Sequence, residues 1–314
     1  MANFKTSART VDMLGRQQIA GIPSAINELF KNAHDAYADR VEVDYYRSDK
    51  LFVLRDDGIG MTETEFEQRW LTLGTDSKVG ASGAMSLPYR PPNKAERPLT
   101  GEKGIGRLAV SVLGPQMLLL TRAQRDDGLH DLVVVFIHWG VFELPGLHLE
   151  DIRIPLRTLP HDRFPTADDV QGMVEEFRAN LTRKSPTARR ILDDLDVCRI
   201  DPEVIADFLP PGPDLRNGGS GTWFIISPAS ELLERDIDGV DMEKDRAPPI
   251  EKLLLGFTQT MTPDHPAPVI KPAFRDHKTD LRFEDRSHED RLFTPEEIIN
   301  ADHRISPLKI GLSP

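Results

Sequence analysis

Three polar residues between positions 28 and 35 have the spacing needed to act together in one site. Glu28, Asn32 and Asp35 stand at i, i+4 and i+7, so on a helix they share one face. The apolar residues between them would pack that helix against a core. Its polar edge would then offer a base for water, an oxygen ligand for a hard cation and a second carboxylate. The same spacing is also typical of the solvated face of an ordinary amphipathic helix, and this segment alone does not decide between the two interpretations.

Two glycine-containing segments favour the chemical interpretation. In residues 51–61 (LFVLRDDGIGM) a short β-rich run ends in two aspartates, which are followed by Gly58 and Gly60. Residues 101–109 (GEKGIGRLA) form a glycine-rich run that leads into the apolar beginning of a helix. Glycines in such a run let backbone amides turn toward an anion, and the helix start adds its dipole. A helix start with glycines for close packing is the simpler explanation of the same pattern.

The glycine-rich run does not match three common phosphate-binding motifs. A Walker A loop requires Lys and then Ser or Thr after its last glycine, whereas this chain has Arg107 and Leu108. Residues 104–109 fit the pattern Gly-x-Gly-x-x-Ala, but residues 97–103 do not have the character of the strand that a dinucleotide fold requires there. A kinase glycine loop would need a Val-Ala-Ile-Lys strand and a His-Arg-Asp loop, and the sequence contains neither.

Periodicity and turn residues predict the elements that would position these segments. Pro23 and Ser24 mark the start of the helix that carries Glu28, and Thr62 with Glu65 forms a capping box. Asp126-Asp127-Gly128 marks a hairpin turn. Strands are predicted at residues 41–46, 51–54, 117–121, 132–138 and 222–227, and helices at 62–73, 108–113, 166–182 and 250–261.

Together with Gly221-Thr222, these segments resemble the GHKL ATPases in their order and form. That superfamily includes gyrase B, MutL, a large heat-shock chaperone and the histidine kinases. The resemblance covers roughly residues 1–265 and is closest to the bacterial relatives of the Microrchidia (MORC) ATPases. It implies the Bergerat-type fold, an α/β (α+β) two-layer sandwich in which a mixed sheet carries helices on one face. The predicted order of strands and helices is compatible with that fold.

The resemblance also implies roles for individual residues. Asp56 would accept a hydrogen bond from the adenine amino group of ATP, Thr222 would support that aspartate, and Asn32 would bind Mg²⁺. Glu28 would be the catalytic base of ATP hydrolysis, a position at which histidine kinases more often carry an amide. The other residues expected to bind the nucleotide are Asp35, Gly58, Gly60, Met61, Gly101, Lys103, Gly104, Ile105, Gly106 and Arg107.

The implied function is an ATP-binding and ATP-hydrolysing switch. ATP would close a lid at about residues 74–103, and two copies would associate as a homodimer while ATP is bound. By analogy with MORC proteins, DNA or another protein would be a partner, in DNA handling or bacterial defence. A histidine-kinase-like catalytic domain and a nucleotide-binding module without turnover are the alternatives. Lys252 and Lys271 are candidates for the lysine that MutL-like enzymes bring to the γ-phosphate.

Composition limits the other classes of function. The chain has 314 residues, 39% hydrophobic and 29% charged, which is typical of a soluble globular protein with one large or two modest domains. Its net charge of −12 argues against charge-driven binding of nucleic acid over the whole surface. The single cysteine, Cys198, and the absence of an apolar run of membrane-spanning length predict a cytoplasmic protein. We expect an ATP-binding domain at residues 1–265 and, at 266–314, a C-terminal extension that could begin a transducer domain.

Overall fold

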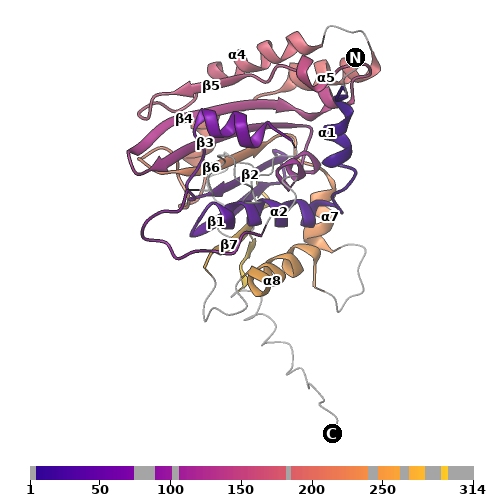
Figure 1. The fold of residues 1–314 in the computed structure, drawn as a ribbon. Helices are drawn as coiled ribbons and strands as arrows, with labels where there is room; N and C mark the ends of the chain where they lie inside the picture. Colours follow the sequence, from indigo (N-terminus) through magenta and orange to yellow (C-terminus); the bar gives the residue numbers. More distant parts are fainter. Residues whose placement is uncertain are drawn as a thin grey trace.

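The computed structural model describes residues 5–73, 89–100, 106–181, 185–239, 247–261, 269–279 and 291–295. Within these ranges the chain forms one eight-stranded mixed sheet in the order β5-β4-β3-β6-β2-β1-β7-β8 (Figure 1). Only β1 and β7 pair in parallel, and every other neighbouring pair of described strands is antiparallel. The strands are β1 (Arg40–Tyr46), β2 (Leu51–Asp56), β3 (Gln116–Arg125), β4 (Gly128–His138), β5 (Leu156–Leu159), β6 (Gly221–Ile226), β7 (Lys271–His277) and β8 (Arg291–Phe293).

Helices connect these strands and cover the sheet. The α-helices are α1 (Arg9–Leu14), α2 (Ile22–Asp35), α3 (Glu63–Glu65), α4 (Ala167–Phe177), α5 (Pro186–Val197), α6 (Pro202–Phe208), α7 (Leu232–Asp238) and α8 (Pro249–Met261). The π-helix η1 (Phe66–Trp70) continues α3, and the 3₁₀ helices are η2 (Gly106–Val112), η3 (Trp139–Glu143), η4 (Leu149–Asp151) and η5 (Arg178–Asn180). The predicted capping box of Thr62 and Glu65 is confirmed, whereas the predicted helix at 108–113 is the 3₁₀ helix η2.

Helix α2 carries the predicted polar edge and is held on the sheet by its apolar face. Pro23 stands in its first turn, where the missing amide hydrogen costs no helical hydrogen bond. Ile26, Leu29 and Phe30 are buried, and the Phe30 ring meets Phe257 of α8 edge to face at 5.5 Å. The α2–α8 layer lies on the same side of the sheet as Tyr45 of β1, whose hydroxyl donates to Glu234 of α7 at 3.1 Å.

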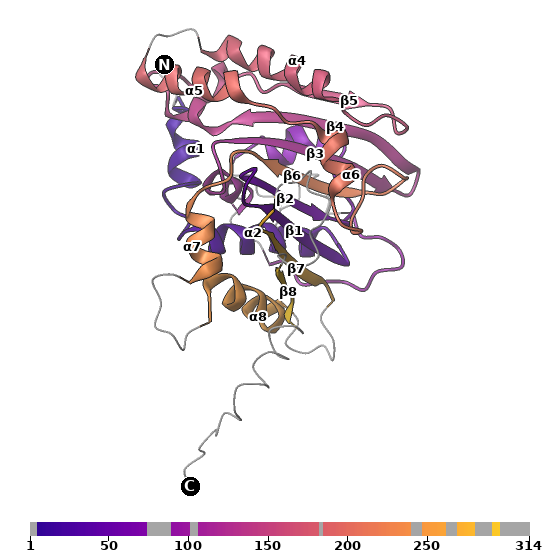
Figure 2. The same ribbon diagram turned by 180° about the vertical axis from the view of Figure 1, so that it is seen from behind.

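The opposite face of the sheet is also covered by helices at its β3–β4 end. Phe136 of β4 packs edge to face against Phe177 of α4 at 5.7 Å, and His138 bonds to Asp194 of α5 at 3.0 Å. Figure 2 shows α6 in front of the sheet on this side and α4 and α5 beside β5. The predicted mixed sheet with covering helices is confirmed. The prediction that helices occupy one face only was wrong at this end, because the aromatic side chains on the second face must also be removed from water.

On that second face, the β1–β2 end carries a buried network of charged groups. Arg55 donates to Asp44 at 2.9 Å and to the carbonyl oxygens of Pro210 and Pro213 at 3.1 and 3.3 Å. Although burial alone would raise the pKa of Asp44, hydrogen bonds from His277 and Arg275 and the nearby cations hold it well below its usual range. Since buried charges require partners, this network fixes the loop that leads into Gly221 and β6.

The C-terminal part of the described chain belongs to the same sheet. Strand β7, which lies beyond residue 265, pairs with β1 along its whole length, and β8 pairs with β7. None of the helices in the described ranges combines the length and the apolar character that crossing a membrane requires.

Candidate functional site

Glu28 lies against the first residue of η2. Its Oε1 accepts a hydrogen bond from Lys31 Nζ at 2.7 Å, one turn further along α2. Its Oε2 faces Gly106, where a Cβ atom would stand only 2.5 Å from that oxygen. Glycine is therefore the only residue type that fits at position 106 without displacing the carboxylate of Glu28. The side chain of Glu28 is about a quarter exposed to solvent.

Asp35 contacts Thr100, the residue that precedes the glycine-rich run. Its Oδ1 accepts hydrogen bonds from the amide and the hydroxyl of Thr100, at 3.0 and 2.9 Å. Thr100 precedes residues 101–105 and Gly106 follows them, so the residues on both sides of this segment lie along the polar edge of α2. Gly101, Lys103, Gly104 and Ile105 lie outside the described residues, as do residues 74–88 of the predicted lid.

Asn32 lies on α2 between these two contacts. It follows Glu28 by four residues and precedes Asp35 by three, and its side chain is partly buried. Within the described part of the chain, no hydrogen bond uses its carboxamide. The same ranges contain no group of three or more His, Cys, Asp or Glu side chains that could hold a metal ion. A cation here would depend on the Asn32 oxygen together with oxygens from a ligand and water, which is how Mg²⁺ is often bound.

Asp56 ends β2 and is buried, with 4% of its surface exposed. Its Oδ1 accepts from the amides of Gly58 and Thr222, at 2.9 and 3.3 Å. No hydrogen bond among the described residues reaches Oδ2. Burial raises the pKa of Asp56 to about 7, and the charge of Asp57 adds to this effect, while the two amides oppose it. A costly buried carboxyl group with one unused oxygen is typical of a ligand-binding position.

The turn after Asp56 requires glycine. Gly60 has a φ of +57°, and a Cβ atom there would stand 2.0 Å from the carbonyl oxygen of Arg122. Gly58 lies beside Ala36, whose carbonyl oxygen accepts a hydrogen bond from the Ile59 amide at 2.9 Å. These contacts bring the turn against the C-terminal end of α2. The turn and the polar edge of the helix therefore form one continuous region.

Thr222 supports Asp56 through its backbone, as described above, and its hydroxyl faces a second threonine. Thr121 of β3 lies opposite it, with 3.1 Å between the two hydroxyl oxygens. The Thr121 oxygen also accepts from the Met61 amide at 2.9 Å, so it connects the turn after Asp56 to β3. Sequence reasoning missed Thr121, because a threonine inside a predicted strand carries no signal of such a contact.

The remaining predicted residues have different surroundings. Arg107 donates to the carbonyl oxygen of Thr72, and burial lowers its pKa. This contact directs the guanidinium toward the residues before position 74. Lys252 and Lys271 are exposed, on α8 and at the start of β7. Asp57 accepts from the amides of Asp39 and Arg40 at 2.7 and 2.8 Å, which secures the connection from α2 to β1.

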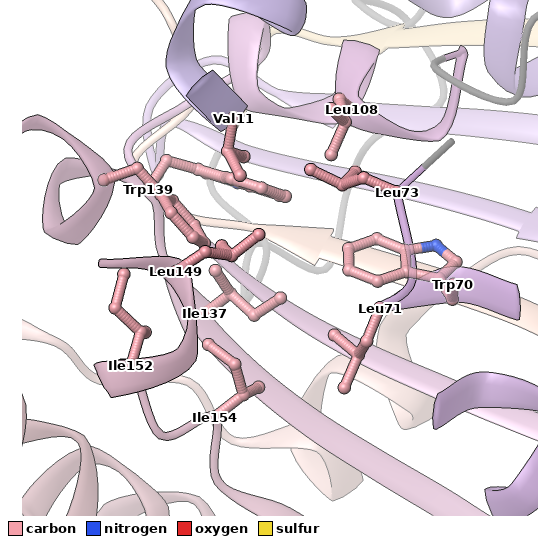
Figure 3. Close-up of a pocket in the computed structure, with 11 residues that line it drawn as sticks. Val11, Trp70, Leu71, Leu73, Leu108, Ile137, Trp139, Leu149, Ile152 and Ile154 are labelled. Atoms are coloured by element: carbon pink, nitrogen blue, oxygen red, sulfur yellow. The ribbon is translucent and has the colours of Figure 1, made fainter. Parts of the chain in front are cut away.

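An apolar pocket of about 130 Å³ lies beside η2, between α1, η1 and β4 (Figure 3). It is lined by Val11, Trp70, Leu71, Leu73, Leu108, Ile137, Trp139, Phe142, Leu149, Ile152 and Ile154. Because its walls offer no charged side chains, this pocket is unsuited to a triphosphate. The polar region along α2 and β2 is the better candidate for phosphate chemistry.

The donor set along α2 and β2 fits ATP with Mg²⁺. Asp56 offers a buried acceptor for an amino group, and Asn32 offers an unused carboxamide oxygen for a hard cation. Glu28 offers a partly exposed carboxylate beside the helix start at Gly106, a place suited to an anion.

The comparison with protein families agrees with this donor set. Residues 21–140 match the family model described as histidine kinase-, DNA gyrase B- and HSP90-like ATPase. No curated protein matches the chain. The matched range begins at α2 and ends just after β4, so it contains Glu28, Asn32, Asp56 and the glycine-rich run. Residues 21–140 are therefore similar to the ATPase domains of the GHKL superfamily.

Proposed function

We propose that this protein binds ATP with Mg²⁺ and hydrolyses its terminal phosphate. The observation that carries the proposal is the arrangement of Asp56 beside the C-terminal end of α2 and Glu28 at the middle of the same helix. The turn after Asp56 contacts Ala36, and Glu28 lies eight residues earlier on the helix. At 1.5 Å per residue this separation is about 12 Å along the helix axis, which suits an elongated ligand.

The adenine end of the ligand would be recognised by Asp56. Its Oδ2 would accept the adenine amino hydrogen, because Oδ1 is already used by the amides of Gly58 and Thr222. The glycine turn lets the chain pass close to a flat base. Asn32 would bind the Mg²⁺, which when present neutralises phosphate charge and orients the terminal phosphate.

Glu28 would act at the other end as the base for water. Oε2 is the oxygen available for this role, because Oε1 is paired with Lys31. A carboxylate that orients a water molecule and takes its proton supports attack in line with the leaving oxygen. Lys31 was not singled out from the sequence. Its charge holds Glu28 in one orientation, and removing it by Lys31→Met would separate orientation of the carboxylate from its presence.

Incubation with γ-labelled ATP distinguishes the proposal from its two alternatives. Free labelled phosphate supports hydrolysis. Label on the protein supports a histidine-kinase-like transfer, and ATP that is bound and recovered intact supports a module without turnover. Labelled phosphate at the rate of a protein-free control, with ATP still bound, would remove hydrolysis from the proposal.

The finer parts of the proposed function rest on the sequence motifs. We propose that ATP drives association of two copies, and light scattering with and without a non-hydrolysable ATP analogue tests this. A monomer under both conditions contradicts it. Likeness to the bacterial MORC relatives, a role in DNA handling or defence, and a cytoplasmic location are supported by the residue patterns alone.

A further inference from the structure

Arg125, near the end of β3, contacts the glycine turn that follows Asp56. Its Nη1 donates to the carbonyl oxygen of Ile59 at 2.8 Å, and its Nη2 donates to that of Gly60 at 3.1 Å. The Ile59 oxygen also accepts from the Gln124 amide at 3.0 Å. One guanidinium group therefore holds two successive carbonyl groups of the turn, which a lysine could not do in the same geometry.

Strand alternation directs Arg125 toward the turn. It stands four residues after Thr121 on β3, so the two side chains share the sheet face that also carries Asp56. The register shift in the β3–β4 pairing places the extra residue on β4, so the alternation of β3 is uninterrupted. The Arg125 side chain is 13% exposed and forms an ion pair with Glu65, which also caps the helix that begins after Thr62. The charge of this arginine is thus balanced while its other donors hold the turn.

Tyr89 covers the guanidinium group of Arg125. The Tyr89 ring lies 5.2 Å from the central carbon of the Arg125 guanidinium, a distance suited to a cation–π contact. The Tyr89 hydroxyl donates to Asp126 at 2.6 Å. Residues 89–100, which continue to Thr100 and its bond with Asp35, are therefore attached at one end to Arg125 and at the other to α2.

We propose that Arg125 is a positioning residue for adenine recognition. By holding the carbonyl groups of Ile59 and Gly60, it fixes the turn whose Gly58 amide orients Asp56. Tyr89 shields this contact from water and makes residues 89–100 part of the same unit. The inference rests on the proposed ATP function for its ligand, but the structural step applies to the nucleotide-free protein and can be measured there.

The test compares Arg125→Lys with the parent chain. Lysine keeps a positive charge near Glu65, but its single nitrogen cannot reproduce the two-nitrogen geometry with which Arg125 binds the two carbonyl groups. The matched control is Arg157→Lys, because Arg157 pairs with Glu176 of α4 away from this turn. Native-state amide hydrogen exchange is measured without nucleotide, and adenosine and ATP affinities are measured by calorimetry.

We expect exchange at the amides of residues 59–62 to become about tenfold faster in Arg125→Lys, while the interior of β2 and the Arg157→Lys control stay unchanged. Adenosine and ATP should both bind about tenfold more weakly, by the same factor, because the loss falls on the adenine end. Tyr89→Leu should change both quantities in the same direction by a smaller factor, and it serves as the second variant if Arg125→Lys does not fold.

Three results overturn the inference. Unchanged exchange at residues 59–62 shows that Arg125 does not hold the turn. Faster exchange at residues 59–62 with unchanged adenosine affinity shows that the turn does not contribute to recognition of the adenine base. Weaker ATP binding with normal adenosine binding assigns Arg125 to the phosphates instead. If the parent binds neither adenosine nor ATP, the proposed ATP function fails, and the exchange measurement still decides whether Arg125 holds the turn.

Discussion

Replacing Asp56 by Asn should increase the stability of the free protein while removing its ATP binding. An asparagine can keep the shape of the side chain and present its oxygen to the amides of Gly58 and Thr222. Its Nδ2 then takes the place of Oδ2. Because that nitrogen is a donor, it would face the adenine amino group, which is also a donor. The variant therefore loses the recognition contact and gains a repulsive one.

The size of the stability effect follows from the pKa of Asp56. Its value of about 7, compared with 3.8 for the model compound, corresponds to a cost of up to about 4 kcal/mol for ionising this group in the folded protein. The folded protein binds the Asp56 proton more tightly than the unfolded protein does. The stabilisation of the folded state by this proton is therefore complete below about pH 3.8 and is lost as the pH rises to about 7. Asparagine avoids this cost but leaves a buried donor without a partner, which costs ~1–3 kcal/mol. The expected net gain at pH 8 is about 1–3 kcal/mol.

Denaturant unfolding at pH 8 and pH 4 and calorimetric titration with ATP measure these effects. At pH 8 the variant should unfold at higher denaturant concentration than the parent. At pH 4 the order should reverse, because the parent then avoids the ionisation cost while the unpaired amide donor of the variant still costs ~1–3 kcal/mol. ATP affinity of the parent should fall as the pH is lowered from 8 to 6, by up to about tenfold per pH unit below 7, because protonation removes the charged acceptor. Unchanged ATP affinity in Asp56→Asn, or equal stability of both proteins at pH 8, would refute this reasoning.

Two further substitutions test the α2 edge. Gly106→Ala places a Cβ atom 2.5 Å from Glu28 Oε2, about 0.9 Å closer than the 3.4 Å at which ordinary contact begins, so the carboxylate must move. The free energy of unfolding should change by less than about 1 kcal/mol because the end of a flexible side chain can move, while phosphate release should fall about 10²-fold. The control is Gly172→Ala, at an open position in α4. Equal phosphate release in both variants would contradict the assignment. Asn32→Ala should weaken ATP binding in Mg²⁺ but not in the presence of a chelator, and calorimetry showing equal losses under both conditions would exclude Asn32 as the metal ligand.

Much of the central fold was predictable because its signals are local. The helix that carries Glu28, the alternating strand at 41–46, the hairpin around Asp127 and the capping box at Thr62 are all confirmed. Strand β7 was missed, because its pairing with β1 is a long-range contact that the residues of β7 alone do not indicate. The helices α5 and α6 were missed as well, and they belong to the layer on the second face.

The site was predictable to the extent that it follows from residue type and spacing. Glu28, Asn32 and Asp35 do share one helix edge, and Asp56 does end a buried strand. The supporting contacts were not predictable. Thr121 and Arg125 reach the glycine turn because β3 lies beside β6, a long-range pairing that no short sequence pattern indicates. Partners of this kind are set by tertiary structure and become visible only when the strands are paired.

The most direct test of the central claim is phosphate release by Glu28→Ala, measured together with its affinity for ATP. The carboxylate is needed for water and not for the nucleotide, so release should fall ~10²–10⁴-fold while ATP affinity stays within about threefold of the parent. Asp56→Asn, purified in the same way, serves as the control for contaminating ATPases because it should not bind ATP. Phosphate release from Glu28→Ala at the parent's rate, above that control, would contradict the role of Glu28 and leave it as one partner of a surface ion pair with Lys31.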